Sequence, residues 1–187
     1  TVSDNVTTIR DWAFSYTNIK TITIGSGVTQ IDSCVFDRSA NLEAINVADE
    51  NTAYSSVDGV LFNKDKTTLY SCPQAKAGTY PMSDIVTAVG ERAFSNCEKI
   101  TEIKLSNNLK TIGYSAFNNC KGLKSLTLPE GLNSIGDFAF YLCNELTSVI
   151  IPGSVSSLGR NAFDRCTAPQ RSQSISLSIF CHRPAVS

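Results

Sequence analysis

The amino-acid sequence predicts a β-rich solenoid, a right-handed coil with a parallel β-sheet along the repeat axis and one inserted β-hairpin. First, the motif Gly-x-x-Ala-Phe-x-x-Cys occurs four times, and its phenylalanines, Phe94, Phe117, Phe140 and Phe163, are each 23 residues apart. Second, apolar residues recur at fixed positions of each unit, and a unit of this size buries its apolar side only by stacking on its neighbours. Third, the chain of 187 residues is 42% hydrophobic, which is sufficient for one packed domain.

Each unit contains three segments in a fixed order, as residues 123–143 show. The first, Leu-x-x-Leu-x-Leu, places its last two leucines on one face of a short strand, because side chains alternate along a strand. The second, Leu-x-x-Ile-Gly, is a short apolar segment whose glycine allows a turn that a Cβ atom would strain. The third, Ala-Phe-x-x-Cys, predicts a return arc, with phenylalanine filling the middle of the coil. Six or seven such coils would form a rod or shallow arc about 30 Å long.

These residues resemble the BspA-like leucine-rich repeats, also called the Treponema pallidum type, whose unit reads approximately L-x-x-I-x-I-P-x-x-V-x-x-I-G-x-x-A-F-x-x-C. The resemblance covers residues 6–47 and 85–166, and it implies a leucine-rich repeat solenoid over residues 1–166. The first two units are less regular, because Thr17 replaces the cysteine of the first and Val35 replaces the alanine of the second.

Residues 48–83 are predicted to be an insert, because the chain between the second and third units is 35 residues longer than one repeat. Within it, the apolar, polar and apolar runs around residues 58–72 predict a β-hairpin. The resemblance implies that this hairpin bulges from the solenoid, and insertions in repeat arrays often lie on the binding face. The alternative is a spacer that packs Phe62 and Tyr70 on the neighbouring coils.

Residues 167–187 do not continue the repeat. Ile175, Leu177 and Ile179 alternate with polar residues, which is typical of an edge strand. The segment is expected to be either an irregular C-terminal cap, since terminal repeats are usually atypical, or a disordered tail.

Four of the seven cysteines, Cys97, Cys120, Cys143 and Cys166, occupy one repeat position and are expected to form a column. Stacked positions lie about 5 Å apart, within the range of a disulfide, but parallel side-chain directions do not favour one. We expect buried, reduced thiols that act as small apolar filler. Metal binding would need converging pairs such as two Cys-x-x-Cys motifs, and the sequence has none.

The sequence contains no recognised catalytic or cofactor motif, neither G-x-x-x-x-G-K-[ST] nor G-x-G-x-x-G nor H-E-x-x-H. Its only histidine, His182, lies in the irregular tail, where a general base would lack rigid support. The acidic stretch 49–51 reads as a solvated loop, because calcium ligands at alternate positions are missing. We therefore expect no enzyme, no metal and no cofactor.

The charge balance also restricts the partners. The formal charge is −1, from 16 Lys plus Arg and 17 Asp plus Glu, whereas nucleic-acid and anionic-membrane binders usually carry a basic excess. No apolar run approaches the roughly 20 residues that cross a bilayer. We expect neither nucleic-acid binding nor membrane insertion.

The outward positions of the predicted strands form a polar face, rich in Thr and Ser and without aromatic residues. Such a face suits a protein partner better than a glycan, since solenoids commonly bind through extended sheets, and the alternative is a solvated face with no partner. The candidate partner-binding residues are Lys20, Thr23, Asn46, Glu102, Lys104, Lys124, Thr127 and Thr147.

The resemblance implies a function as well as a fold. BspA-like repeat proteins are typically secreted or displayed on the surface of bacteria and some protists, where they are linked to adhesion. We therefore expect a non-enzymatic, monomeric protein-binding module of an extracellular or cell-surface adhesin, with a host extracellular-matrix or microbial surface protein as its ligand. The alternative is a structural repeat spacer that displays another domain.

Overall fold

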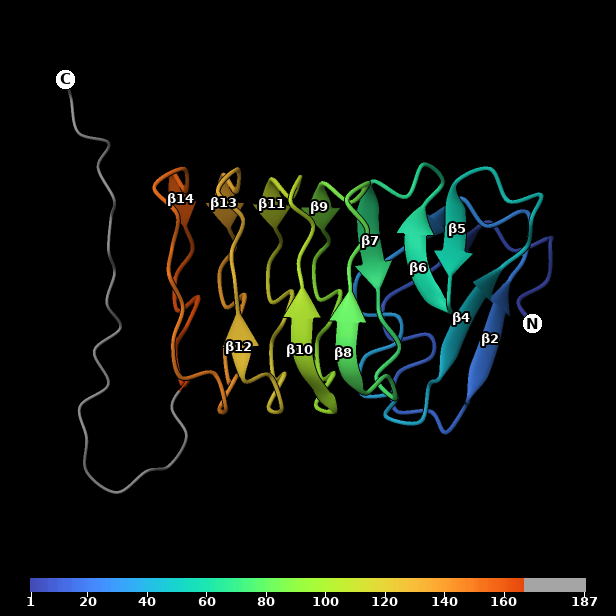
Figure 1. Ribbon diagram of the computed structural model, residues 1–187. Helices are drawn as coiled ribbons and strands as arrows, with labels where there is room; N and C mark the ends of the chain where they lie inside the picture. The colour runs from blue at the N-terminus through green and yellow to red at the C-terminus, as the bar shows by residue number, and fades with distance from the viewer. Residues whose placement is uncertain (167–187) are drawn as a thin grey trace.

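The computed structural model describes residues 1–166, which form a β-solenoid of about seven turns with no helix in that range (Figure 1). The predicted fold class is confirmed, and the segment 167–187 lies outside the described residues. The strands are β1 (Thr8–Ile9), β2 (Thr21–Ile24), β3 (Gln30–Ile31), β4 (Ala44–Val47), β5 (Tyr54–Val57), β6 (Val60–Asn63), β7 (Thr68–Ser71), β8 (Gly78–Pro81), β9 (Ala88–Val89), β10 (Ile100–Lys104), β11 (Thr111–Ile112), β12 (Ser125–Leu126), β13 (Ser134–Ile135) and β14 (Ser157–Leu158).

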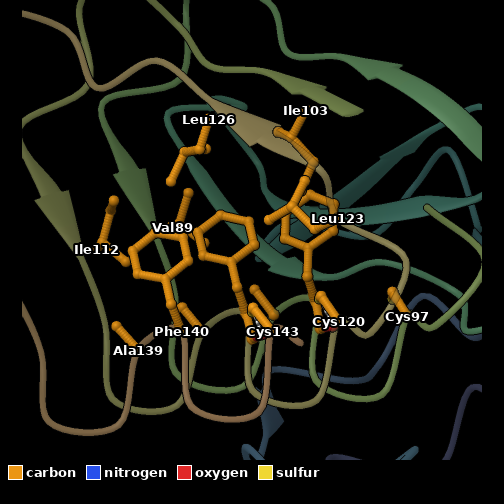
Figure 2. Close-up of a cluster of buried hydrophobic side chains, with 14 of the residues drawn as sticks. Val89, Cys97, Ile103, Ile112, Cys120, Leu123, Leu126, Ala139, Phe140 and Cys143 are labelled. Carbon is orange, nitrogen blue, oxygen red and sulfur yellow. Dashed lines mark hydrogen bonds between the residues drawn. The ribbon is translucent and has the colours of Figure 1, made fainter. Parts of the chain in front are cut away.

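The coils have three sides, one for each segment of the repeat. The first side, which we call the strand face, contains the parallel sheets β2-β4 and β8-β10-β12, and the second side contains the row β9-β11-β13-β14 (Figure 1). In the first two coils, the pair β1-β3 occupies the same repeat position as this row. The third side is the arc from the repeat glycine to the cysteine. Apolar side chains of all three sides point inward, as the buried isoleucines and leucines of the strands show (Figure 2).

The predicted hairpin is present and is larger than one pair of strands. Strand β6 pairs in antiparallel fashion with β5 on one side and with β7 on the other, and β7 then pairs in parallel with β9. The hairpin therefore does not bulge from the solenoid. It continues the second side as a seven-stranded sheet of order β14-β13-β11-β9-β7-β6-β5.

Strand β6 separates two apolar clusters and packs against both. Along this strand, Val60 and Phe62 belong to the cluster of the C-terminal coils, whereas Leu61 belongs to the cluster of the N-terminal coils. This alternation is the period of a strand that is buried on both faces. The insert is therefore part of the core that joins the two groups of coils.

Phenylalanine stacks fill the middle of the coils. The rings from Phe94 to Phe163 stack with centroids 4.9–5.0 Å apart and nearly parallel planes, and Phe94, Phe117 and Phe140 have no exposed surface (Figure 2). Phe14 and Phe36 form a second stack, 6.1 Å apart, in the N-terminal cluster. The 23-residue period thus places identical rings one above the other.

The repeat glycines are needed for close stacking of the backbone, which differs from the turn predicted from the sequence. Gly113 and Gly136 have ordinary backbone conformations, since the glycines with positive φ are Gly59 and Gly78. A Cβ atom on Gly136 would lie 2.7 Å from backbone atoms of Gly113 and Tyr114 in the preceding coil. A side chain there would force two coils apart.

The arcs form their own ladder of hydrogen bonds between coils. The amide of Phe117 donates to the Ala139 carbonyl at 2.7 Å, and the next amide, of Asn118, donates within its own coil to Ser115. This alternation requires left-handed backbone at the second and sixth residues after each repeat glycine. These residues are Arg92 and Asn96, Ser115 and Asn119, Phe138 and Leu142, and Asn161 and Arg165, with φ between 49° and 62°. Non-glycine residues rarely adopt this conformation, and here the inter-coil hydrogen bonds stabilise it.

Asn51 is fully buried, so the prediction that residues 49–51 form a solvated loop is wrong for this residue. Its amide group donates to the carbonyls of Gly25 and Val28, and its carbonyl oxygen accepts from the amides of Ala53 and Tyr54. Four hydrogen bonds satisfy the side chain completely. Asn51 therefore ties the start of the insert to the second coil.

Gly136→Ala should lower the free energy of unfolding by about 1–3 kcal/mol, because the added methyl group meets backbone atoms that cannot move independently. Gly131→Ala is the matched control, since its Cβ would meet only the flexible Lys110 Nζ, and it should change stability by less than about 0.5 kcal/mol. Urea denaturation followed by circular dichroism measures both. Equal effects of the two substitutions would contradict the stacking role.

Candidate functional site

The predicted binding residues are exposed or half-buried on the strand face, but the structure divides them into two groups. Lys20, Thr23 and Asn46 belong to the sheet β2-β4 or its margin, and Lys20 forms an exposed ion pair with Glu43 at 3.4 Å. The other group lies along β8-β10-β12 and the coil that follows. Its members are Glu102, Lys104, Lys124, Thr127 and Thr147. The predicted face is therefore not one continuous sheet.

The turn of the hairpin lies between these two groups. Asp58 and Gly59, both with positive φ, connect β5 to β6. The amide of Ile45 in β4 donates to the Gly59 carbonyl at 2.8 Å, and a Cβ on Gly59 would lie 2.7 Å from the Cβ of Ala44. Lys76 Nζ donates to the Asp58 carbonyl at 2.6 Å. The turn is thus fixed against the exposed edge of β4.

A hollow of about 500 Å³ lies between this hairpin and β8, and we call it the junction hollow. This volume is within the usual range for ligand sites. Its wall is mostly apolar, with Phe62 and Tyr80 buried or partly buried and Val57 and Ile85 41% and 56% exposed. The lining residues are Val57, Asp58, Phe62, Lys66, Lys76, Ala77, Thr79, Tyr80, Pro81, Ser83, Ile85, Val86 and Ile100.

The junction hollow is continuous with the predicted strand face. Thr79 lines it and donates through its hydroxyl to Glu102 of β10 at 2.9 Å. Tyr80, beside Thr79, packs edge-on against Phe94 with centroids 5.2 Å apart, and burial raises the pKa of its hydroxyl. Tyr80 therefore stays neutral and forms a rigid part of the wall.

Sequence reasoning identified some residues of this hollow but not the hollow itself. Phe62 is buried there, whereas Tyr70, also in the insert, is 41% exposed and packs against Tyr54 on the opposite side of β6. Val57, Ile85 and Lys66 were not predicted as site residues. Val57 and Lys66 lie in the insert and Ile85 at the start of the next unit, and their apolar or basic residue type is the only signal that the sequence carries for them.

Within residues 1–166, the four cysteines of the column are buried free thiols, as predicted, but they are more than apolar filler. Cys120 Sγ donates to the Phe94 carbonyl of the preceding coil at 3.1 Å, and the same carbonyl accepts the amide of Cys97. Cys143 and Cys166 repeat this contact in the following coils. The thiols therefore add a hydrogen bond between coils.

Hydroxyl groups occupy the same repeat position in the first two coils. Ser39, which is fully buried, donates through Oγ to the Phe14 carbonyl at 2.7 Å, and Thr17 Oγ1 donates to that carbonyl at 2.9 Å. The position therefore selects a small hydrogen-bond donor rather than a cysteine as such.

Cys143 and Cys166 are less reactive than an ordinary thiol. Interaction with the neighbouring Cys120 thiol, followed by burial, raises the pKa of Cys143, and Cys166 is affected in the same way by Cys143. A raised pKa lowers the population of the reactive thiolate. Within residues 1–166, no three His, Cys, Asp or Glu side chains gather closely enough to hold a metal ion. In the same range no helix has the length and apolar character needed to cross a membrane.

Comparison with known proteins gives one family. The model of the BspA type leucine-rich repeat region matches residues 1–74 and 63–180, with six copies in total. No curated protein sequence matches the chain.

Solved bacterial structures have the same fold. The pneumococcal vaccine antigen PcpA is 30% identical with a TM-score of 0.78, over 82% of this chain and 38% of that one. A leucine-rich repeat protein from Eubacterium ventriosum is 26% identical with a TM-score of 0.74, over 86% and 50%. A leucine-rich cell surface protein from Faecalibacterium prausnitzii is 29% identical with a TM-score of 0.69, over 88% and 50%. The chain spans half or less of each of these proteins.

Cys120→Ser should preserve more stability than Cys120→Val. The serine hydroxyl can donate to the Phe94 carbonyl as Ser39 does to Phe14, whereas valine loses the donor and adds volume, for a difference of about 1 kcal/mol. Chemical denaturation in reducing buffer measures it. If the position required only an apolar filler, valine would be the more stable variant.

The free energy of unfolding should fall as the pH rises above about 8.5, the pKa of an ordinary thiol. The pKa values of Cys97, Cys143 and Cys166 are raised in the folded chain, so the unfolded chain loses its thiol protons first and gains stability. Denaturation in reductant at pH 7 and pH 10 tests this. A variant with these three cysteines changed to serine should show a smaller decrease, and an equal decrease would contradict the assignment.

Proposed function

The chain belongs to the BspA-type leucine-rich repeat family, and we propose that it is a non-enzymatic protein-binding part of a secreted or cell-surface adhesin. Leucine-rich repeat solenoids generally mediate protein–protein interactions and are typically non-enzymatic scaffolds. A surface location is supported by the relatives, which include a vaccine antigen and a cell surface protein. The ligand would be a host extracellular-matrix protein or a microbial surface protein.

The observation on which this proposal depends is the junction hollow. A mostly apolar concavity with a few polar groups at its rim is the usual form of a binding site. Exposed Val57 and Ile85 can receive an apolar side chain of a partner, and the ammonium groups of Lys66 and Lys76 lie in the same lining. The hollow therefore suits a protein segment that presents an apolar side chain beside a carboxylate.

The strand face extends this contact. Glu102 and Lys104 of β10 follow the hollow through the Thr79 contact, and Lys124 and Thr127 follow on the next coil. These polar residues would form the rim around the apolar centre, an arrangement in which the buried centre supplies most of the binding energy. The predicted residues of the sheet β2-β4 lie on the other side of the hairpin and are assigned a smaller role.

The alternative function is a structural spacer that displays another domain. It is supported by the relatives, since this chain spans only half or less of each of them. In that case the binding surface would lie in another part of the protein, and the junction hollow would have no ligand. Measuring the retention of variants on surfaces coated with candidate ligands distinguishes a binding module from a spacer.

Ile85→Asp should weaken retention of the chain on its protein ligand at least about tenfold, because a charge replaces an apolar contact at the centre of the site. Leu158→Asp is the matched control, since Leu158 is 47% exposed and lies in β14 on the second side, away from the hollow and the strand face, and it should leave retention unchanged. Surfaces coated with purified extracellular-matrix proteins and with bacterial surface extracts provide the ligands. Saturable binding that both variants retain equally would place the site elsewhere, and no saturable binding would favour the spacer.

A further inference from the structure

A second concavity lies on the arc side of the molecule, where the arcs lead toward the strand face, and we call it the arc groove. Its volume is about 670 Å³. Three successive coils contribute to it, together with the second coil and the end of the insert. The lining residues are Arg38, Ala40, Gln74, Asn96, Glu98, Lys99, Asn118, Asn119, Lys121, Tyr141 and Leu142. In contrast to the junction hollow, most of these residues are polar.

A ladder of amide side chains runs along the groove. Asn96 Nδ2 donates to the buried carboxylate of Asp37 at 2.8 Å, and Asn119 Nδ2 donates to Asn96 Oδ1 at 2.7 Å. The ladder ends at the next coil, where Leu142 occupies the same repeat position. The ladder holds the first two amides in fixed orientations.

Hydrogen-bonding capacity remains unused at the end of this ladder. Within residues 1–166, the side-chain oxygen of Asn119 accepts no hydrogen bond, and the amide group of Asn118 has no partner at all. The Asn118 amide therefore offers two donors and an acceptor. Asn119, whose amide group donates to Asn96 and Glu98, offers its oxygen as a further acceptor. Together they match neighbouring hydroxyl groups that both donate and accept. Vicinal hydroxyl groups are the characteristic groups of a sugar ring.

The charges in and beside the groove are mostly paired, with one cation in excess. Lys121 forms an ion pair with Glu98 at 2.8 Å, and Arg38 lies 4.0 Å from the Asp37 carboxylate. Lys99 is exposed and forms no ion pair within the described part of the chain. A ligand with a carboxylate would therefore find a free ammonium group and the outer nitrogens of an exposed guanidinium group.

An aromatic ring closes one end of the groove. Tyr141 packs nearly perpendicular to Phe138 with centroids 5.7 Å apart, and the Arg165 guanidinium lies over one face of the Tyr141 ring, 5.6 Å from its centroid. The ring is fixed before any ligand binds, and aromatic rings supply flat apolar surface of the kind that packs on the apolar face of a sugar. An aromatic residue, which the strand face was predicted to lack, is thus present here.

We propose that the arc groove binds an acidic oligosaccharide, with sugar hydroxyl groups on Asn118 and Asn119, a sugar ring against Tyr141 and a carboxylate between Lys99 and Arg38. This site is separate from the proposed protein-binding surface and does not depend on it. A carboxylate sugar could be a sialic acid or a uronic acid, and both present the same group.

Isothermal titration calorimetry with 3′-sialyllactose, a hyaluronan tetrasaccharide and neutral lactose tests the proposal. We expect saturable binding of at least one acidic sugar, and the stronger of the two identifies the source of the carboxylate. Lactose should bind at least about tenfold more weakly, because a hydrogen bond between charged groups is lost. Absence of binding to both acidic sugars, or equal binding of lactose, would overturn the proposal.

Three variants and one competitor complete the test. Asn118→Ala and Lys99→Gln should each weaken binding of the acidic sugar about fivefold or more, whereas Asn133→Ala, an exposed asparagine of the second side, should not change it. Equal melting temperatures of the variants show that folding is retained. Displacement of the sugar by a short glutamate peptide at similar concentration would mean that the groove recognises charge alone, and this result would also overturn the proposal.

Discussion

Identical positions of successive coils lie one above the other at about 4.9 Å, as the phenylalanine rings show, and the other features of the molecule must satisfy this spacing. The arcs meet it by exchanging backbone hydrogen bonds from coil to coil. The repeat glycines meet it by having no Cβ, and the cysteine position meets it with a small donor that reaches the preceding carbonyl. The same spacing between coils therefore favours phenylalanine, glycine and cysteine at three different positions of one repeat unit.

Much of the fold could be predicted from the sequence, because columns of identical residues are visible in a single chain. The period, the burial of Phe117 and Cys120 and the outward position of Lys124 all follow from counting along the repeat. The left-handed backbone of the arcs could not be predicted in this way. Residues such as Phe138 and Leu142 hold that conformation without glycine, and the hydrogen bonds that stabilise it come from another coil.

The candidate sites were less accessible to sequence reasoning, because each one joins segments that are distant in the chain. Phe62 of the insert and Ile85 of the next coil line one hollow, and Arg38 and Tyr141 line the other. Asn51 shows the same difficulty, since its residue type suggests a loop while its four partners lie inside the fold. A repeat pattern predicts neighbours one period apart, and these contacts depend on the segment that breaks the pattern.

The hairpin, whose strand β6 packs into both apolar clusters, gives the molecule a fixed reference point. Contacts in a solenoid are made between nearest neighbours, so duplication or loss of a 23-residue coil beyond Cys143 would leave the junction hollow and the arc groove as they are. The array can then change its length by copy number while its chemical surfaces remain constant. Solenoids of different length could therefore carry the same site, because a change in the number of coils does not alter the residues that line it.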